Sequence, residues 1–419
     1  MSLKRLYGLL LFAAVLRAQQ MPGMPGMSGM SHMGMNAAGM YLMNEASGTS
    51  MNPQSWPMPM AMLHFGKWHL MLMGQGFLVD TQQSGPRGGD KFYSPNWWMA
   101  SAFHSVGRGT LELQAMISLE PATITDRRYP ELFQTGETAY GKPLVDAQHP
   151  HNAIMALGFQ YARPLAAGTM FSIYLAPVGD PALGPVAFPH RASAFELPQA
   201  PLGHHWQDST HIADDVVTVT LRHDWLRLEA SGFHGAEPGE NRWTIEQGAI
   251  DSWSTRVSAF PTRNWMAQVS VGRLARPERE APGDVVRTTA SVHYTRPMGK
   301  REAWSSSVIW GRNHDTATQH DLNSWLLETL LPVRGKNFLT SRVEWVDKDE
   351  LFGEAGPIYR IGAYTAGYTR DLGTLFGVLE TGIGANVTTY SVPAAIQPVY
   401  GSRPVGGDVY LRVRINPER

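Results

Sequence analysis

Histidines are concentrated in one part of this chain. Six of the fifteen lie between Asp146 and Ile212, among prolines, glycines and acidic residues. Imidazole and carboxylate groups bind Zn(II) and Cu(II), and two histidines one residue apart on an extended segment point the same way. The sequence therefore predicts candidate ligands for Zn(II) or Cu(II) in two short motifs, which contain His149, His151, His204, His205, Asp208 and His211.

These motifs also fit other interpretations. No spacing matches a strong zinc signature such as HExxH. The polar side chains could instead hydrogen-bond to one another and to the backbone, and so hold a loop folded into a lumen. Ser209 lies near His205 and Asp208 and so supplies the residue types of a hydrolytic triad, but a triad is defined by geometry. A lipid or ester hydrolase with its site in residues 145–212 is an alternative, although the sequence gives no firm basis for an enzyme.

Methionines form a second group with possible chemistry. Thioether sulfur is a soft ligand suited to Cu(I), and sulfurs two or three residues apart in a flexible chain can converge on one ion. One face of the first predicted strand continues this pattern with a histidine and two methionines. The predicted soft-metal ligands are Met21, Met24, Met27, Met30, His32, Met33, Met35, His69, Met71 and Met73. The alternative is a low-complexity tail whose methionines are incidental.

The run from Met21 to Met35 reads Met-Pro-Gly-Met-Pro-Gly-Met-Ser-Gly-Met-Ser-His-Met-Gly-Met. It resembles the Met- and His-rich heads of bacterial copper-resistance outer-membrane proteins, in which such a head precedes a barrel. The resemblance implies copper, as Cu(I) or Cu(II), and either copper ions or a periplasmic copper protein as partner. It covers this run and the overall plan. The remainder is similar to exported bacterial barrels of no established activity.

The N-terminal region predicts export. Lys4 and Arg5 precede the apolar run Leu6–Leu16, so residues 1–18 are expected to be a signal peptide. Residues 19–63 are rich in Met, Gly and Pro, and we expect a largely disordered periplasmic segment there. The absence of cysteine excludes disulfides and thiolate metal sites, and a net charge of -1 gives no reason to expect a nucleic-acid partner.

From residue 64 onward, apolar and polar residues alternate with a period of two. Leu111, Leu113 and Ala115, for example, alternate with Glu112 and Gln114. This period is typical of strands with two different faces. The predicted strands are 64–80, 96–106, 108–119, 152–163, 168–178, 214–223, 225–233, 250–261, 263–275, 284–297, 302–313, 323–331, 336–347, 360–370, 374–386 and 407–417.

The connections between these strands also alternate in length. Even-numbered strands are followed by tight turns, and odd-numbered strands mostly by longer loops, with about thirty residues at 120–151 and 179–213. Outer-membrane barrels sort their connections in this way. Residues 64–419 are therefore predicted to be an all-β, antiparallel transmembrane β-barrel of about 16 strands with long ordered loops on one rim. A soluble protein of two β-sandwich domains is the alternative.

Aromatic residues near the predicted strand ends fit membrane-interface girdles. They are Trp68, Trp97, Trp98, Trp225, Trp253, Trp265, Trp304, Trp325, Trp345 and Tyr410. The expected location is the cell outer membrane, with outer-membrane lipid as a partner and the N-terminal segment in the periplasm. The predicted function is a pore or binding protein that handles copper or a related metal, and a general porin with an incidental Met-rich head is a further alternative.

Overall fold

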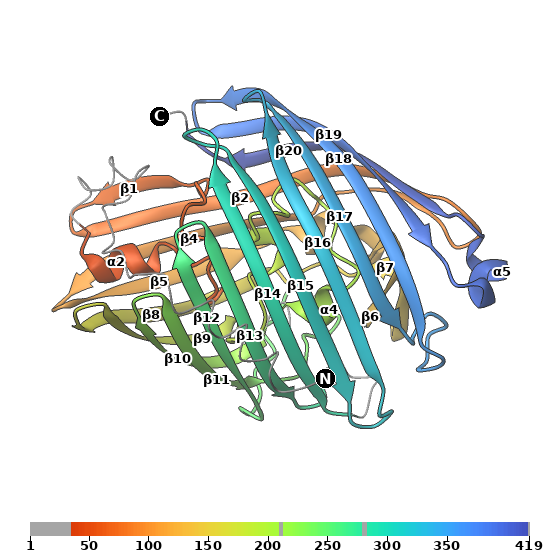
Figure 1. Ribbon diagram of the computed structural model, residues 1–419, viewed down its shortest axis with the longest axis horizontal. Coiled ribbons are helices and arrows are strands. Elements are labelled where there is room, and N and C mark those ends of the chain that lie inside the picture. The colour runs from red at the N-terminus through yellow and green to blue at the C-terminus, as the bar shows by residue number, and fades with distance from the viewer. Residues whose placement is uncertain (1–34, 209–212, 279–282, 418–419) are drawn as a thin grey trace, which may run out of the picture. The chain divides into compact units, whose positions relative to one another are not determined.

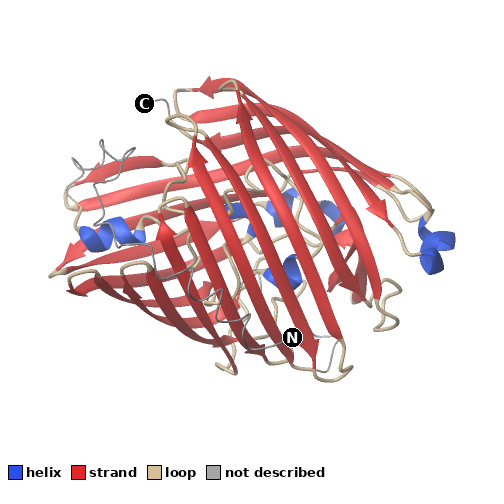
Figure 2. Ribbon diagram, in the orientation of Figure 1, coloured by secondary structure: helices blue, strands red, loops and turns tan. Residues whose placement is uncertain are grey.

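The computed structural model describes residues 35–208, 213–278 and 283–417. Within them, sixteen antiparallel strands form a closed barrel, as the sequence predicted (Figures 1 and 2). The barrel closes where Gln75–Gln83 of the first strand pairs with Gly406–Arg414 of the last. The strands are β2 (Trp68–Gln83), β4 (Asn96–Val106), β5 (Gly109–Ile117), β8 (Ile154–Ala166), β9 (Thr169–Gly179), β10 (Ala213–His223), β11 (Leu226–His234), β12 (Ser252–Thr262), β13 (Trp265–Leu274), β14 (Val285–Pro297), β15 (Ala303–Asp315), β16 (Asp321–Val333), β17 (Asn337–Lys348), β18 (Tyr359–Leu375), β19 (Leu379–Ser391) and β20 (Val405–Ile415).

Shorter elements complete the fold. β1 (Ala61–Phe65) and β3 (Asp90–Tyr93) pair with the ends of β2, and β6 (Tyr129–Ala139) and β7 (Lys142–Gln148) form a separate hairpin. The described helices are α2 (Ala37–Leu42), α3 (Glu120–Thr123), α4 (His204–Gln207) and α5 (Gln397–Tyr400), with 3-10 turns at Thr125–Arg127, Phe188–His190 and Ala394–Ile396. Among the described residues, no helix is long and apolar enough to cross a bilayer.

The two faces of the barrel wall differ in polarity. In β20, the outward residues Val409 and Leu411 are 59% and 45% exposed, whereas the inward residues Arg412 and Arg414 are 0% and 4% exposed. A soluble sandwich would place the apolar face inside and the charged face in water. This wall does the opposite, as a membrane barrel does, with an apolar outer band and a polar interior.

Three strand predictions need correction. The predicted strand 64–80 contains the β1–β2 turn at Gly66 (φ 60°), which the apolar pattern on both sides concealed. The turn expected between the predicted strands 360–370 and 374–386 lies further along the chain, because Gly373 (φ 120°) lies at a bulge, β18 continues to Leu375 and β19 begins at Leu379. The loop predicted at 120–151 holds the β6–β7 hairpin, whose irregular pairing has no clear period of two.

The predicted aromatic girdle is partly correct. Six of the named tryptophans are exposed on the outside of the barrel, namely Trp225, Trp253, Trp265, Trp304, Trp325 and Trp345. Trp97 and Tyr410, by contrast, are only 4% and 1% exposed and lie on inward-facing positions. Trp97 follows directly on Asn96, and its ring packs against His190 from the lumen. The period of two in a strand does not by itself show which of its faces points out of the barrel.

Residues 36–63 belong to the barrel unit and include α2 and the start of β1, whereas their composition alone favours a largely disordered segment. Asn36 caps α2 through Gly39 and accepts a hydrogen bond from Thr110 of β5. Further along, Glu45 forms an ion pair with the inward-facing Arg227 of β11 (2.6 Å). The segment therefore fills part of the lumen. The predicted signal peptide and most of the Met-rich head, residues 1–34, lie outside the described residues.

The β9–β10 loop crosses the lumen as well. From Asp180 to Asp208, nearly every residue of this loop is buried. The loop reaches distant parts of the wall, because Arg256 of β12 donates to the Gly184 carbonyl (3.0 Å) and Gln75 of β2 donates to the Phe195 carbonyl (3.1 Å). It carries α4, which Figure 1 shows inside the barrel, behind β14 to β16. The loop and residues 36–59 together occupy the barrel interior.

Candidate metal centre in the barrel lumen

Two close backbone approaches hold α4 against the inner wall. Gly311 of β15 faces α4, and a Cβ at this position would lie 2.0 Å from the Trp206 carbonyl oxygen. Gly203, at the start of α4, would likewise place a Cβ 1.9 Å from the Ser324 hydroxyl. Any larger residue at either position would push the helix away from the wall. These glycines therefore set the position of His204 and His205.

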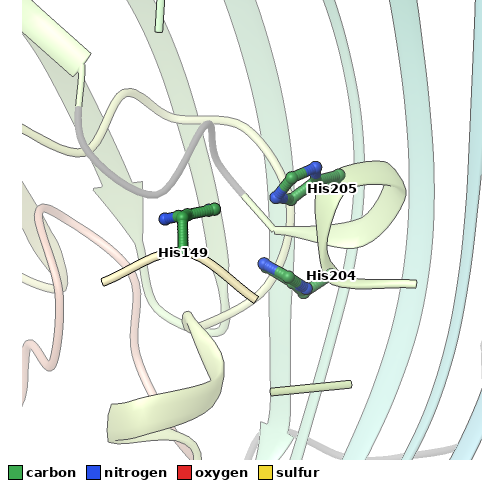
Figure 3. Close-up of side chains that lie close together, drawn as sticks. All are labelled: His149, His204 and His205. Atoms are coloured by element: carbon green, nitrogen blue, oxygen red, sulfur yellow. The ribbon is translucent and has the colours of Figure 1, made fainter. Parts of the chain in front are cut away.

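Three histidines meet in the lumen in front of α4 (Figure 3). His149 follows β7, and His204 and His205 begin α4. One ring nitrogen from each lies within 4.8 Å of those from the other two, and all three side chains are buried. Around a tetrahedral ion with metal–nitrogen bonds of about 2.0–2.1 Å, the nitrogens would be about 3.3 Å apart. Small side-chain rotations would therefore close the three around one ion.

The three imidazoles are neutral at neutral pH. Burial lowers the pKa of His149 to about 4, and burial together with the neighbouring histidines holds the pKa values of His204 and His205 well below the usual range. His149 Nδ1 donates to the Pro150 carbonyl (3.1 Å), and His204 Nδ1 donates to the Pro201 carbonyl (2.7 Å). Since a neutral imidazole has one N–H, these contacts leave the lone pair on Nε2 of His149 and of His204, whose Nδ1 also lies 3.2 Å from Gln134 Nε2. Such backbone contacts are typical of histidines that ligate metals.

Glu137 of β6 lies next to this cluster. Its Oε1 is 3.2 Å from His149 Nε2, and its other oxygen pairs with Arg242. With the proton on Nε2, His149 would donate to this carboxylate; with the proton on Nδ1, both groups are acceptors, and the Arg242 guanidinium on Glu137 offsets their repulsion. The neighbouring Gly136 (φ 112°) lets the hairpin come this close to the histidine cluster, since a Cβ at position 136 would lie 2.3 Å from the His205 ring.

The other predicted ligands of the loop are placed differently. His151 Nδ1 is 2.9 Å from Glu120, and although burial lowers the pKa of His151, that carboxylate raises it above the usual value. This contact favours the protonated form of His151, and a protonated imidazole does not ligate. Asp208 forms an ion pair with Arg191 (3.2 Å) and accepts a hydrogen bond from the Phe188 amide. The remaining members of the two motifs, Ser209 and His211, lie outside the described residues, and with them the proposed hydrolytic triad.

The soft-metal candidates of the first strand share one face, as predicted. His69, Met71 and Met73 lie on the inner face of β2, with Met71 and Met73 2% and 3% exposed. Met73 lies opposite Met99 of β4, which lies opposite Met116 of β5. Met35 is half-buried, and the remaining candidates Met21, Met24, Met27, Met30, His32 and Met33 lie outside the described residues.

Sequence reasoning missed several of these neighbours. Glu137 carries no local signal, because its contact with His149 depends on the fold of the β6–β7 hairpin. His64, whose Nδ1 lies 2.9 Å from His69 Nδ1 across the β1–β2 pair, was hidden by the missing turn. Met116 could have been found, since the period of two places it on the same strand face as Glu112, and Met99 lies opposite Met116 in the neighbouring strand.

The barrel is of the outer-membrane class. The sequence matches no protein-family model and no curated protein. The structure is similar to Salmonella typhi OmpF in complex with daunomycin, with 8% identity, a TM-score of 0.51, and coverage of 84% of this chain and 100% of that chain. This likeness supports the fold alone.

Two other porin-type structures are more distant. The anion-selective porin from Comamonas acidovorans has 10% identity and a TM-score of 0.47, with coverage of 83% of this chain and 100% of that chain. OmpT, an outer membrane protein of Vibrio cholerae, has 9% identity and a TM-score of 0.44, with coverage of 84% and 99%.

Proposed function

We propose that this outer-membrane barrel is a metal-binding protein that holds a Zn(II) or Cu(II) ion inside its lumen. The observation that carries the proposal is the group of three buried, neutral imidazoles, with ligand nitrogens within 4.8 Å of one another. Imidazole nitrogen suits both ions, and Glu137 could supply an oxygen as a further ligand.

The sorting of the connections supports an orientation for this proposal. Bacterial barrels place short turns on the periplasmic side and long loops outside. The β9–β10 loop that carries α4 enters from the long-loop rim, whereas Asn36 contacts Gly109 beside the short β4–β5 turn. The metal centre would then be reached from outside the cell, and the Met-rich head would lie in the periplasm.

The test is metal binding by the purified, detergent-solubilised full-length protein. His149→Ala combined with His204→Ala removes two of three ligands and should abolish tight binding of one equivalent of Zn(II), measured by equilibrium dialysis and elemental analysis. Cu(II) loading should give an electron paramagnetic resonance spectrum with nitrogen hyperfine structure in the parent protein and not in the variant.

His190→Ala is the matched control. His190 is equally buried and lies in the same loop, but its ring packs on Trp97 and is not part of the cluster. This variant should retain the full metal content. Equal Zn(II) stoichiometry in all three proteins would remove the proposal, and a folded parent protein with no tight site would do the same.

A second proposal concerns Cu(I), because the inner wall carries additional thioethers. Met73, Met99 and Met116 occupy directly paired positions on three neighbouring strands and are 3–5% exposed. Thioether sulfur suits Cu(I), and the methionines of residues 21–35 would extend this set beyond the barrel. We propose that the Met-rich head collects Cu(I), as the resemblance to copper-resistance proteins implies.

Replacing the five methionines Met21, Met24, Met27, Met30 and Met33 by leucine should remove most of the Cu(I) bound at equilibrium. Leucine preserves size and apolar character while removing sulfur, so barrel assembly should be unaffected. Competition with a chromophoric Cu(I) chelator measures the stoichiometry. Met298→Leu, in the exposed β14–β15 turn, is the control. A stoichiometry unchanged by the five substitutions would make the head an incidental tail.

A further inference from the structure

An acidic cavity of about 520 Å³ lies among the long loops. The β6–β7 hairpin and the loops after β11, β13, β15 and β17 contribute its lining. These connections all belong to the long-loop rim. Seven of the lining side chains are carboxylates, and Arg242 is the basic one among the described lining residues.

Three of these carboxylates have structural roles. Glu137 pairs with Arg242, and Glu240 pairs with Arg127 (2.7 Å) and accepts from the backbone of the β6–β7 turn. Asp315 accepts two backbone N–H groups of its own loop, those of residues 317 and 318. These interactions account for the three without any ligand.

The other four carboxylates are not accounted for in this way. Glu237, Glu278, Glu350 and Glu354 form no side-chain ion pair or hydrogen bond with any residue in 35–208, 213–278 or 283–417. Glu237 is only 6% exposed, and its Oε2 atom is buried without a partner. An ionised carboxylate buried in this state is costly unless an ion compensates it.

Three of the four also repel one another. Burial raises the pKa of Glu237 to about 7, and burial together with the Glu237 charge raises the pKa of Glu278 to about 7. The Glu278 charge, followed by burial, raises the pKa of Glu350 to about 8. The opposing charges that lower these pKa values, Arg287 and Lys348, are already bonded to the Asp208 carbonyl and to Gln134. The loops thus bring together negative charges that nearby basic residues compensate only in part.

We propose that this cavity binds a hydrated divalent cation of the calcium and magnesium class, which Glu237, Glu278 and Glu350 hold through the waters of the ion, since among the described residues only the three histidines bring their ligand atoms within 4.8 Å of one another. Ligands that are all oxygens favour hard cations over the ions that imidazole prefers. The cavity has room for an ion that keeps several of its waters, as Mg²⁺ does. Because the three carboxylates come from three different loops, the ion clamps these loops together over the lumen. The cavity adjoins the three-histidine cluster, because Glu137 lines the cavity and lies 3.2 Å from His149, but the three carboxylates proposed to hold this cation are different residues.

Mn²⁺ binding to the full-length protein in a phosphate-free detergent tests the proposal. The electron paramagnetic resonance signal of free Mn²⁺ counts bound ions directly, whether or not binding affects stability. We expect one weak site, with a dissociation constant of about 10⁻⁴–10⁻³ M as in extracellular calcium modules. The triple variant Glu237→Gln, Glu278→Gln and Glu350→Gln should lose this site, and Ca²⁺ should displace Mn²⁺ from the parent protein.

Two matched variants make the result specific. Asp126→Asn, Asp224→Asn and Glu302→Gln together remove the same charge from positions outside the cavity and should leave Mn²⁺ binding unchanged. His149→Ala with His204→Ala should also retain it, which distinguishes this site from the lumenal centre. In addition, Ca²⁺ should raise the unfolding temperature of the parent protein and of both matched variants but not that of the glutamine triple variant.

Several outcomes would overturn the proposal. Equal Mn²⁺ binding in the glutamine triple variant and the parent would place the ion elsewhere. A parent protein with no Mn²⁺ site would show that protons alone neutralise the carboxylates. Loss of Mn²⁺ in the double histidine variant alone would assign the ion to the lumenal centre. Conversely, if the parent protein binds Mn²⁺ at this site but binds no Zn(II), the proposed lumenal metal centre would be wrong and the cation site in the acidic cavity would still hold.

Discussion

Replacing residues 181–211 by a short Gly-Ser turn is expected to raise the single-channel conductance of the barrel by about tenfold or more. Barrels of sixteen strands enclose an aqueous channel when nothing fills them. The β9–β10 loop crosses this space and bonds to opposite walls, at Arg256 and Gln75. Gly179 and Ala213 are already paired, so a short turn can join them without distorting the wall. Recordings in planar bilayers measure the change.

Deletion of residues 352–356 provides the control for this experiment. These residues belong to the β17–β18 loop, are mostly exposed, and lie between strand ends that pair at Lys348 and Tyr359. The shortened loop should leave conductance near its original value. If the 181–211 replacement conducts no better than the parent while its barrel assembles, the lumen must be closed by residues 36–59 rather than by this loop.

The wall of the barrel was predictable because its signal is local. In β20, the alternation of Val409 and Leu411 with Arg412 and Arg414 is visible within six residues, and each short turn fixes the register of the next strand. Which face points outward could not be predicted. A strand whose apolar face contacts lipid and a strand whose apolar face contacts a packed core show the same period of two. Burial in the closed barrel settles this, with Arg412 fully inside.

The lumenal segments were not predictable to the same degree. Residues 36–59 carry glycine, proline and methionine, which suggest disorder when read alone. Their order comes from distant partners on the wall, such as Arg227 for Glu45 and Arg256 for Thr49. The β6–β7 hairpin is similar, because several of its residues adopt positive φ, including Phe133 (66°) and Glu137 (64°). Such conformations are imposed by tertiary contacts.

The candidate metal centre was predictable in its residue types but not in its membership. His149, His204 and His205 stood out as histidines in a loop, and so did His151 and Asp208. What separates the two groups is a partner far along the chain. Glu120 neutralises His151 from 31 residues away, while Glu137 approaches His149 through a strained hairpin. No sequence spacing encodes these pairings.

The second large effect is expected from Arg191, whose side chain is fully buried in the lumen. Its guanidinium joins Asp208 of the loop (3.2 Å) to Glu328 of β16 (3.1 Å) and also donates to the Val186 carbonyl. Arg191→Met should lower the free energy of unfolding by about 3–5 kcal/mol, because it leaves the buried Asp208 carboxylate without its counter-charge. Urea unfolding in lipid vesicles measures this change, and looser attachment of the loop should also raise conductance.

The double variant Arg191→Met with Asp208→Asn separates charge imbalance from lost packing. It removes one charge of each sign and leaves Glu328 paired with Arg342 (2.8 Å), so most of the lost stability should return. Arg312→Met is the control, since Arg312 pairs with Asp321 on the surface and such pairs contribute at most about 1 kcal/mol. Equal stability of the single and double variants would show that the methylenes of Arg191 and its contact with the Val186 carbonyl stabilise the loop, and that its ion pairs do not.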